Sequence, residues 1–81
     1  MRDKIFLLLA YINEHEPDMK ELEESKIYYR SKLYPALDNL RQAGFIKSNY
    51  KIMREKVVYY PTLDGMKFYR LYKRFYDTCL E

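Results

Sequence analysis

The stretch SKLYPALDNLRQAGFIKSNY, residues 31–50, changes its hydrophobic period at a single glycine. Before Gly44, apolar residues recur at the 3.6-residue spacing of a helix, at Leu33, Leu37 and Leu40. After Gly44, the pattern changes to the two-residue period of a strand. Glycine easily adopts the left-handed conformation that ends many helices. The stretch therefore predicts a helix that stops at Gly44 and leads directly into a strand.

The first residue of this helix is less sharply marked. We expect the helix to begin between Tyr29 and Ser31, where the helical pattern starts. Pro35 is tolerated if it lies in or just after the first turn, because its missing N–H then removes little from the hydrogen bonds of the helix. The helix therefore either starts near Ser31 or starts earlier and carries a small kink.

Two further helices are predicted on the N-terminal side. Residues 2–15 carry apolar side chains at helical spacing, and Pro17 ends the pattern. Asp18 is a good N-cap for a short second helix that runs to about Glu24. Glu21 follows Asp18 by three residues, which is the spacing of a capping box.

A hairpin and a last helix are predicted on the C-terminal side. Residues 45–52 and 56–61 have the composition of two strands, with the hairpin tip at residues 53–55. Thr62 is the expected N-cap of a final helix that runs to about Leu80. The order is then helix, helix, helix, strand, strand, helix. This mainly α fold with one small β-hairpin (α+β) is a winged helix, in which the second and third helices form a helix-turn-helix and the hairpin forms the wing.

Length and composition predict one small domain, residues 1–81, without a metal or cofactor. A chain of this size buries only about 60% of the surface that its unfolded form exposes, so it often depends on a partner subunit. A single cysteine and a single histidine are too few for a disulfide framework, a zinc cluster or a catalytic triad, and we expect no enzyme. The longest apolar run is far shorter than the roughly 20 residues of a membrane span. We expect a cytoplasmic, DNA-associated protein.

Charge is distributed unevenly along the chain. Residues 18–24 carry four acidic side chains and one basic side chain. Residues 25–63 carry eight basic and two acidic side chains, although the net charge of the whole chain is only +3. The middle of the chain, which holds the third helix and the hairpin, is therefore expected to meet a partner with negative charge.

The runs SKLYPALDNLRQAGFIKS and VVYYPTLDGMKFY resemble the PadR-like branch of winged-helix transcriptional regulators. The resemblance covers about residues 28–70. Small winged-helix proteins of archaea and their viruses are similar in size and element order. The positions that match the family pattern are Ser31, Leu33, Tyr34, Pro35, Leu37, Leu40, Gly44, Ile46, Tyr59, Thr62 and Gly65.

This resemblance implies a sequence-specific regulator that binds double-stranded DNA. The third helix would enter the major groove, and the wing would contact the backbone or the minor groove. The alternative is a winged-helix module that binds protein or RNA, but the position of the positive charge favours DNA. The candidate DNA-binding residues are Tyr28, Tyr29, Arg30, Ser31, Lys32, Tyr34, Asn39, Lys51, Arg54 and Lys56.

Several of these candidates also have an ordinary structural interpretation. Tyr34 fits equally well under the wing or against the first helix. The wing cations Lys51, Arg54 and Lys56 also fit a solvated hairpin rim.

The last helix carries more apolar residues than one stripe requires. We expect one face (Phe68, Leu71 or Tyr72, Phe75, Cys79) to cover the domain and the opposite face to stay exposed. An exposed face of that size usually marks an interface. With the resemblance, it predicts a homodimer through residues 63–81 and a palindromic DNA site whose half-sites lie about 34 Å apart. Cys79 either pairs with its symmetry mate or remains a free thiol. The expected interface residues are Met66, Tyr69, Tyr72, Tyr76, Cys79 and Leu80.

Overall fold

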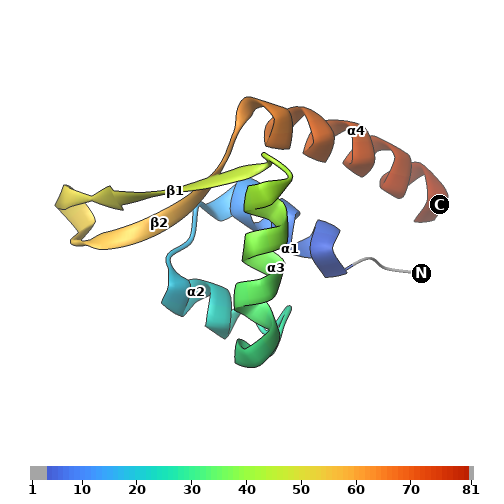
Figure 1. Cartoon of the computed structure of the whole chain (residues 1–81). Helices are drawn as coiled ribbons and strands as arrows, with labels where there is room; N and C mark the ends of the chain where they lie inside the picture. The colour runs from blue at the N-terminus through green and yellow to red at the C-terminus, as the bar shows by residue number, and fades with distance from the viewer. Residues whose placement is uncertain (1–3, 81) are drawn as a thin grey trace.

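In a computed structural model, three helices form a cluster from which a hairpin extends to one side and a fourth helix to the other (Figure 1). The structure describes the backbone of residues 4–80 and the side chains of residues 4–75. The element order is that of a winged helix, as predicted. The elements are α1 (Lys4–His15), α2 (Met19–Glu24), α3 (Arg30–Gln42), β1 (Ile46–Lys51), the short 3-10 helix η1 (Ile52–Arg54), β2 (Lys56–Pro61) and α4 (Leu63–Leu80).

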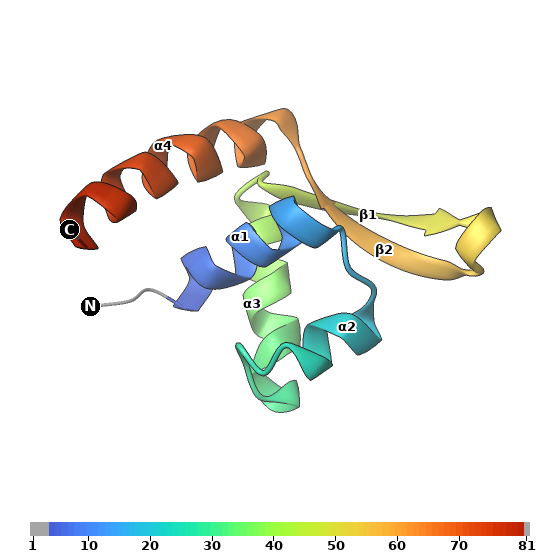
Figure 2. The same ribbon diagram turned by 180° about the vertical axis from the view of Figure 1, so that it is seen from behind.

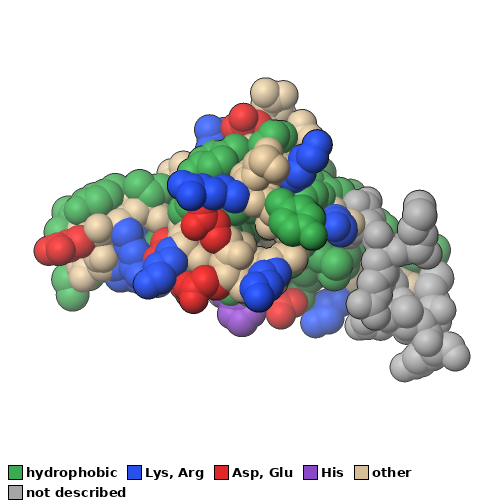
Figure 3. All heavy atoms as spheres, turned by 90° about the horizontal axis from the view of Figure 1, so that it is seen from below, with side chains coloured by type: hydrophobic (Ala, Val, Ile, Leu, Met, Phe, Trp, Pro, Cys, Tyr) green, Lys and Arg blue, Asp and Glu red, His purple; other side chains and the backbone are tan. Residues whose placement is uncertain are grey.

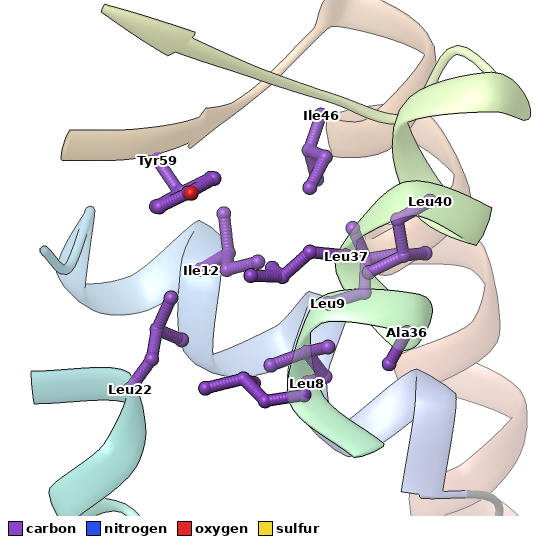
Figure 4. Close-up of a cluster of buried hydrophobic side chains, with 10 residues drawn as sticks. Leu8, Leu9, Ile12, Leu22, Ala36, Leu37, Leu40, Ile46 and Tyr59 are labelled. Atoms are coloured by element: carbon purple, nitrogen blue, oxygen red, sulfur yellow. The ribbon is translucent and has the colours of Figure 1, made fainter. Parts of the chain in front are cut away.

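The hydrophobic core lies between α1 and α3, with one side chain from α2 and one from each strand (Figure 4). The leucine stripe that predicted α3 faces this core, since Leu33, Leu37 and Leu40 are all buried. Seen from behind, α1 crosses α3 and continues through a short loop into α2, while strand β2 passes close to the end of α1 (Figure 2). The core residues are Leu8, Leu9, Ile12, Leu22, Leu33, Ala36, Leu37, Leu40, Ile46 and Tyr59.

Helix α3 ends at the glycine that the sequence pattern indicated. Gly44 has a φ of 81°, in the left-handed region. The N–H of Phe45 donates to the carbonyl of Leu40 at 2.9 Å, and the N–H of Gly44 donates to the carbonyl of Arg41 at 3.0 Å. These two bonds form a Schellman motif, which satisfies the last carbonyls of the helix. The chain passes directly from this motif into β1.

The start of α3 lies within the predicted window. Arg30 is the first helical residue, and Tyr29 is the N-cap. Pro35 is therefore the sixth residue of the helix, beyond its first turn. It has no N–H to donate to the carbonyl of Ser31, so α3 lacks one hydrogen bond of the regular ladder.

The hairpin is regular along its strands and irregular at its tip. The strands pair antiparallel from Ile46 opposite Pro61 to Lys51 opposite Lys56. The prediction that Ile52 lies in the first strand is wrong, because Ile52 begins η1 and is 81% exposed. The tip contains no glycine, and a glutamate, Glu55, adopts the left-handed conformation that closes it.

The outer edge of the hairpin is attached to the junction between α1 and α2. The N–H of Tyr59 donates to the carbonyl of Pro17 at 2.8 Å. Asp18 forms an antiparallel bridge with Val58. Strand β2 therefore pairs on both edges, and the wing has a fixed position relative to the helix-turn-helix.

Helix α4 begins at a tightly packed junction with the start of β1. The hydroxyl of Thr62 accepts a hydrogen bond from the N–H of Gly65 at 3.0 Å, which confirms the predicted N-cap. The same hydroxyl donates to the carbonyl of Gly44 at 2.6 Å. The N–H of Thr62 donates to the carbonyl of Phe45 at 3.0 Å. Three hydrogen bonds thus determine the direction in which α4 leaves the wing.

The predicted division of α4 into two faces is wrong in part. Tyr69, expected on the free face, stacks on Phe6 of α1 with ring centroids 6.1 Å apart. Its hydroxyl donates to the carboxylate of Glu14, and burial together with this bond raises the pKa of Tyr69. Phe75, expected to cover the domain, is 69% exposed, and so is Leu71, one of the two alternatives for that face, at 71%. Tyr72, the alternative to Leu71 in the predicted stripe, does pack on Phe6 of α1. Phe68 stacks on Phe45, so that part of the stripe covers the domain as predicted.

The other residues of α4 that were predicted to form the dimer interface lie in different surroundings from one another. Met66 is half-buried beside α1 and the end of β2. Tyr72 packs on Phe6 with ring centroids 4.2 Å apart. The side chains of Tyr76, Cys79 and Leu80 lie outside the described residues.

Within residues 4–80, the helices are too short or too polar to cross a membrane.

Candidate nucleic-acid interface

The first two turns of α3 present a row of polar and aromatic side chains to solvent. Ser31, Lys32 and Tyr34 are exposed, whereas Leu33 and Ala36 between and beside them are buried. Tyr34 is 51% exposed, so it is not enclosed under the wing. The start of α3 therefore offers a continuous outward face of the kind that a groove-reading helix needs.

Two of the candidates near α3 are placed differently from the rest. Asn39 is exposed but borders an apolar hollow between α1, α3 and α4, about 14 Å along the helix from Arg30. Tyr28 is half-buried and packs against the core, whereas its neighbour Tyr29 is 82% exposed. The structure thus groups Tyr29 with the start of α3 and leaves Asn39 apart.

Three of the predicted DNA-contacting cations form ion pairs with carboxylates of α2 or its N-cap. Arg30 Nε lies 3.2 Å from Glu23 Oε1. Arg54 Nη2 lies 3.3 Å from Glu21 Oε1, so the wing tip also reaches α2. Lys56 forms the third pair, with Asp18. Lys51, the remaining wing candidate, is exposed opposite Lys56.

These pairs change how the charge distribution is interpreted. The acidic segment 18–24, which is separate from the basic segments along the sequence, packs between the start of α3 and the wing. The face seen from below accordingly shows lysine and arginine side chains with carboxylates between them (Figure 3). The charge separation along the chain is only partly maintained in space.

Asp18 is the centre of the contact between α2 and the wing, and it is only 6% exposed. Its carboxylate accepts from the N–H of Glu21 at 2.8 Å, and its own N–H donates to the carboxylate of Glu21 at 3.2 Å, which completes the predicted capping box. Lys56 Nζ lies 2.6 Å from its second oxygen. The sequence identified the cap but not the pair, because Lys56 is remote in the chain.

The two hydrogen bonds to Asp18 give the fold a dependence on pH. The bond from Lys56, and then that from the N–H of Glu21, lower the pKa of Asp18 below its ordinary value. A lowered pKa means that the folded state favours the carboxylate. The resulting stability is present above the unfolded pKa of about 3.9 and is lost as the pH falls through the lower folded pKa.

We therefore expect Asp18→Asn to lower the free energy of unfolding at pH 7 by about 1–2 kcal/mol, since the amide still caps α2 but loses its charge-assisted bond to Lys56. The difference from the wild type should shrink as the pH falls from 5 to 2.5. Thermal unfolding at several pH values measures both. Asp38→Asn, at an exposed carboxylate 3.9 Å from Arg41, is the control and should have little effect. If the wild type and Asp18→Asn differ in stability by the same amount at every pH, the pKa of Asp18 is not lowered in the folded state.

The fold is similar to that of FabT of Streptococcus pneumoniae, whose crystal structure was determined in complex with DNA. The TM-score is 0.78 and the sequence identity 22%, over 99% of this chain and 57% of the FabT chain. This chain thus spans little more than half the length of that protein. No protein-family model matches the sequence, and no curated protein is significantly similar to it. The membership in a PadR-like family remains a prediction, while the structural match shows that the chain has a winged-helix fold.

Proposed function

We propose that this protein is a transcriptional regulator that binds specific sites in double-stranded DNA. The observation that carries the proposal is the exposed start of α3, where Arg30, Ser31 and Lys32 follow one another on a helix whose opposite face packs in the core. The similarity in fold to a protein solved in complex with DNA supports it. In this proposal α3 enters the major groove with its N-terminal turns foremost.

The contacts at the start of α3 suit both phosphate binding and base recognition. Arg30 has a side chain that is 81% exposed despite its pair with Glu23, so it is free to exchange the carboxylate for a ligand. A guanidinium that binds a guanine edge with two hydrogen bonds contributes about 1–3 kcal/mol of discrimination. In this proposal Lys32 and Tyr29, which are both exposed, contact the flanking phosphates.

In this proposal the wing contributes mainly through Lys51 and through its position. Arg54 and Lys56 hold the wing against α2 by their pairs with Glu21 and Asp18. Those pairs keep the angle between wing and α3 constant. The wing then approaches the backbone or minor groove as a fixed arm that needs little ordering on binding.

We further propose a homodimer formed through α4, with a surface that differs from the sequence prediction. Phe68, Leu71, Tyr72 and Phe75 surround an apolar hollow of about 270 Å³. A second apolar hollow, of about 180 Å³, adjoins it between α1, α3 and α4. Exposed apolar surface of this extent usually marks an interface. Of the predicted interface residues, Tyr72 belongs to this surface, whereas Tyr69 faces α1.

Selection of bound sites from a random pool of duplexes tests the proposal. We expect enrichment of a palindromic sequence whose half-sites are about 10 base pairs apart, since a dimer places two α3 helices roughly one DNA turn apart. If the enriched site has no symmetry, the proposal of DNA binding stands and the proposal of a dimer fails. If nothing is enriched, the sequence-specific proposal fails.

A protein-interaction module is the second candidate. Two exposed apolar side chains at the wing tip, Ile52 and Met53, favour it, with exposures of 81% and 96%. The mixed charge of the face in Figure 3 is also compatible with a protein partner. Failure of the site selection would make this the leading function.

A further inference from the structure

A hollow of about 560 Å³ lies where the start of α1 meets the turn between α2 and α3. Its cations come from three separate places in the chain. Lys4 begins α1, Lys26 lies in the turn, and Arg30 begins α3. Tyr28 and Tyr29 complete the polar lining. The fold thus collects basic side chains that the sequence places up to 26 residues apart.

The charge of this hollow is suited to an anion. The three cations face one carboxylate in the lining, that of Glu23, which lies 3.2 Å from Arg30. Two positive charges therefore remain in excess, and the tyrosines add hydroxyl groups, which donate hydrogen bonds to phosphate oxygens in many complexes. This combination of lysine, arginine and tyrosine is typical of contacts to a nucleic-acid backbone.

The backbone at Lys26 is a second unusual feature of the hollow. Lys26 has a φ of 58°, a left-handed conformation that a long side chain adopts at a cost and that glycine or asparagine adopts more easily. The N–H of Lys26 donates to the carbonyl of Glu23 at 3.3 Å, which closes the turn. Lys26 thus lies at the rim of the basic hollow in a backbone conformation that disfavours long side chains, which makes it a candidate for a functional contact.

We propose that this hollow binds one phosphate of the DNA backbone, next to the major groove that receives α3. The inference rests on the proposed function and extends it to Lys4 and Lys26, which the sequence did not indicate as contacts. A backbone phosphate is favoured over a free anion because the hollow adjoins Arg30, the first residue of α3. The strand that borders the groove then passes directly over it.

The test uses the double variant Lys4→Gln/Lys26→Asn, in which asparagine tolerates the left-handed backbone. Duplex affinity should fall about tenfold at moderate salt, and the slope of log K against log salt should decrease by about one unit, because one phosphate contact contributes roughly 0.9. The matched control, Lys67→Gln/Arg70→Gln, removes the same charge from exposed positions of α4 and should leave the slope unchanged. Thermal unfolding checks that both variants fold.

Neutral methylphosphonate, introduced at one backbone position at a time, identifies the phosphate. One position should weaken wild-type binding and have no effect on the double variant. Glu23→Gln should act in the opposite direction and tighten binding several-fold, since it removes the carboxylate that competes for Arg30.

The outcomes separate this inference from the proposed function. If the double variant keeps the wild-type slope and methylphosphonate profile, the hollow is not a phosphate site, although DNA binding stands. If the wild type binds no duplex, both proposals fail. A titration with inorganic phosphate, in which the NMR amide signals of Lys4 and Lys26 are monitored, tests whether the hollow binds a free anion. Saturable binding of phosphate without any effect of the double variant on DNA would overturn the backbone assignment.

Discussion

Replacement of Arg30 and Lys32 together by alanine is expected to weaken binding to duplex DNA by about 100-fold. A bidentate contact to a base edge contributes roughly 1–3 kcal/mol. The two side chains are both exposed on the same turn of α3, so both can reach the DNA in the proposed complex. The slope of log K against log salt should also decrease by about two units if both residues contact phosphates. A smaller change in slope with the same loss of affinity would indicate that one of the two reads a base.

The fold should tolerate this double substitution. Alanine is the best helix former, and the pair between Arg30 and Glu23 is exposed, so its loss costs at most about 1 kcal/mol. The control is the variant Lys20→Ala/Lys67→Ala, which removes the same charge from exposed positions of α2 and α4. Equal loss of binding in the two variants would mean that only net charge matters, and the proposal that α3 is the recognition helix would fail.

Gly65→Ala is expected to destabilise the protein by about 3 kcal/mol, at the upper end of what overpacking costs. A Cβ at this position would lie 2.0 Å from the carbonyl oxygen of Phe45 and 3.0 Å from its carbon. Both are backbone atoms, so the start of α4 has to move away. The same carbonyl accepts the N–H of Thr62, and this bond would be strained at the same time.

Thermal unfolding measures the effect, which corresponds to a decrease in Tm of roughly 15 °C for a domain of this size. Gly44→Ala is the contrasting control. Within the described residues, no heavy atom outside Gly44 and its two chain neighbours lies within 4 Å of the Cβ position, so only the left-handed φ of 81° opposes alanine. That strain costs about 1 kcal/mol. A smaller effect at Gly65 than at Gly44 would show that α4 does not need its close approach to β1.

Features that depend on neighbouring residues were predicted well from the sequence. The change of period at Gly44, the cap at Asp18 and the cap at Thr62 each involve a few consecutive residues. The hairpin tip was also predicted to within one residue, although the glycine that usually marks such a turn is absent and Glu55 adopts the left-handed conformation instead. Local hydrogen-bond chemistry and hydrophobic period were sufficient for the order of the elements.

The sequence by itself determined a winged helix with a polar, cationic start to α3, because backbone capping and side-chain period act over distances of a few residues. The tertiary structure alone decided which carboxylates face which cations, as in the pair of Asp18 and Lys56. It also decided that α4 rests on α1 through Tyr69 and leaves Phe75 exposed. The physical reason is that Coulomb attraction and packing depend on distance in space, and the way in which α2 and the wing meet is set by the whole core rather than by any single segment.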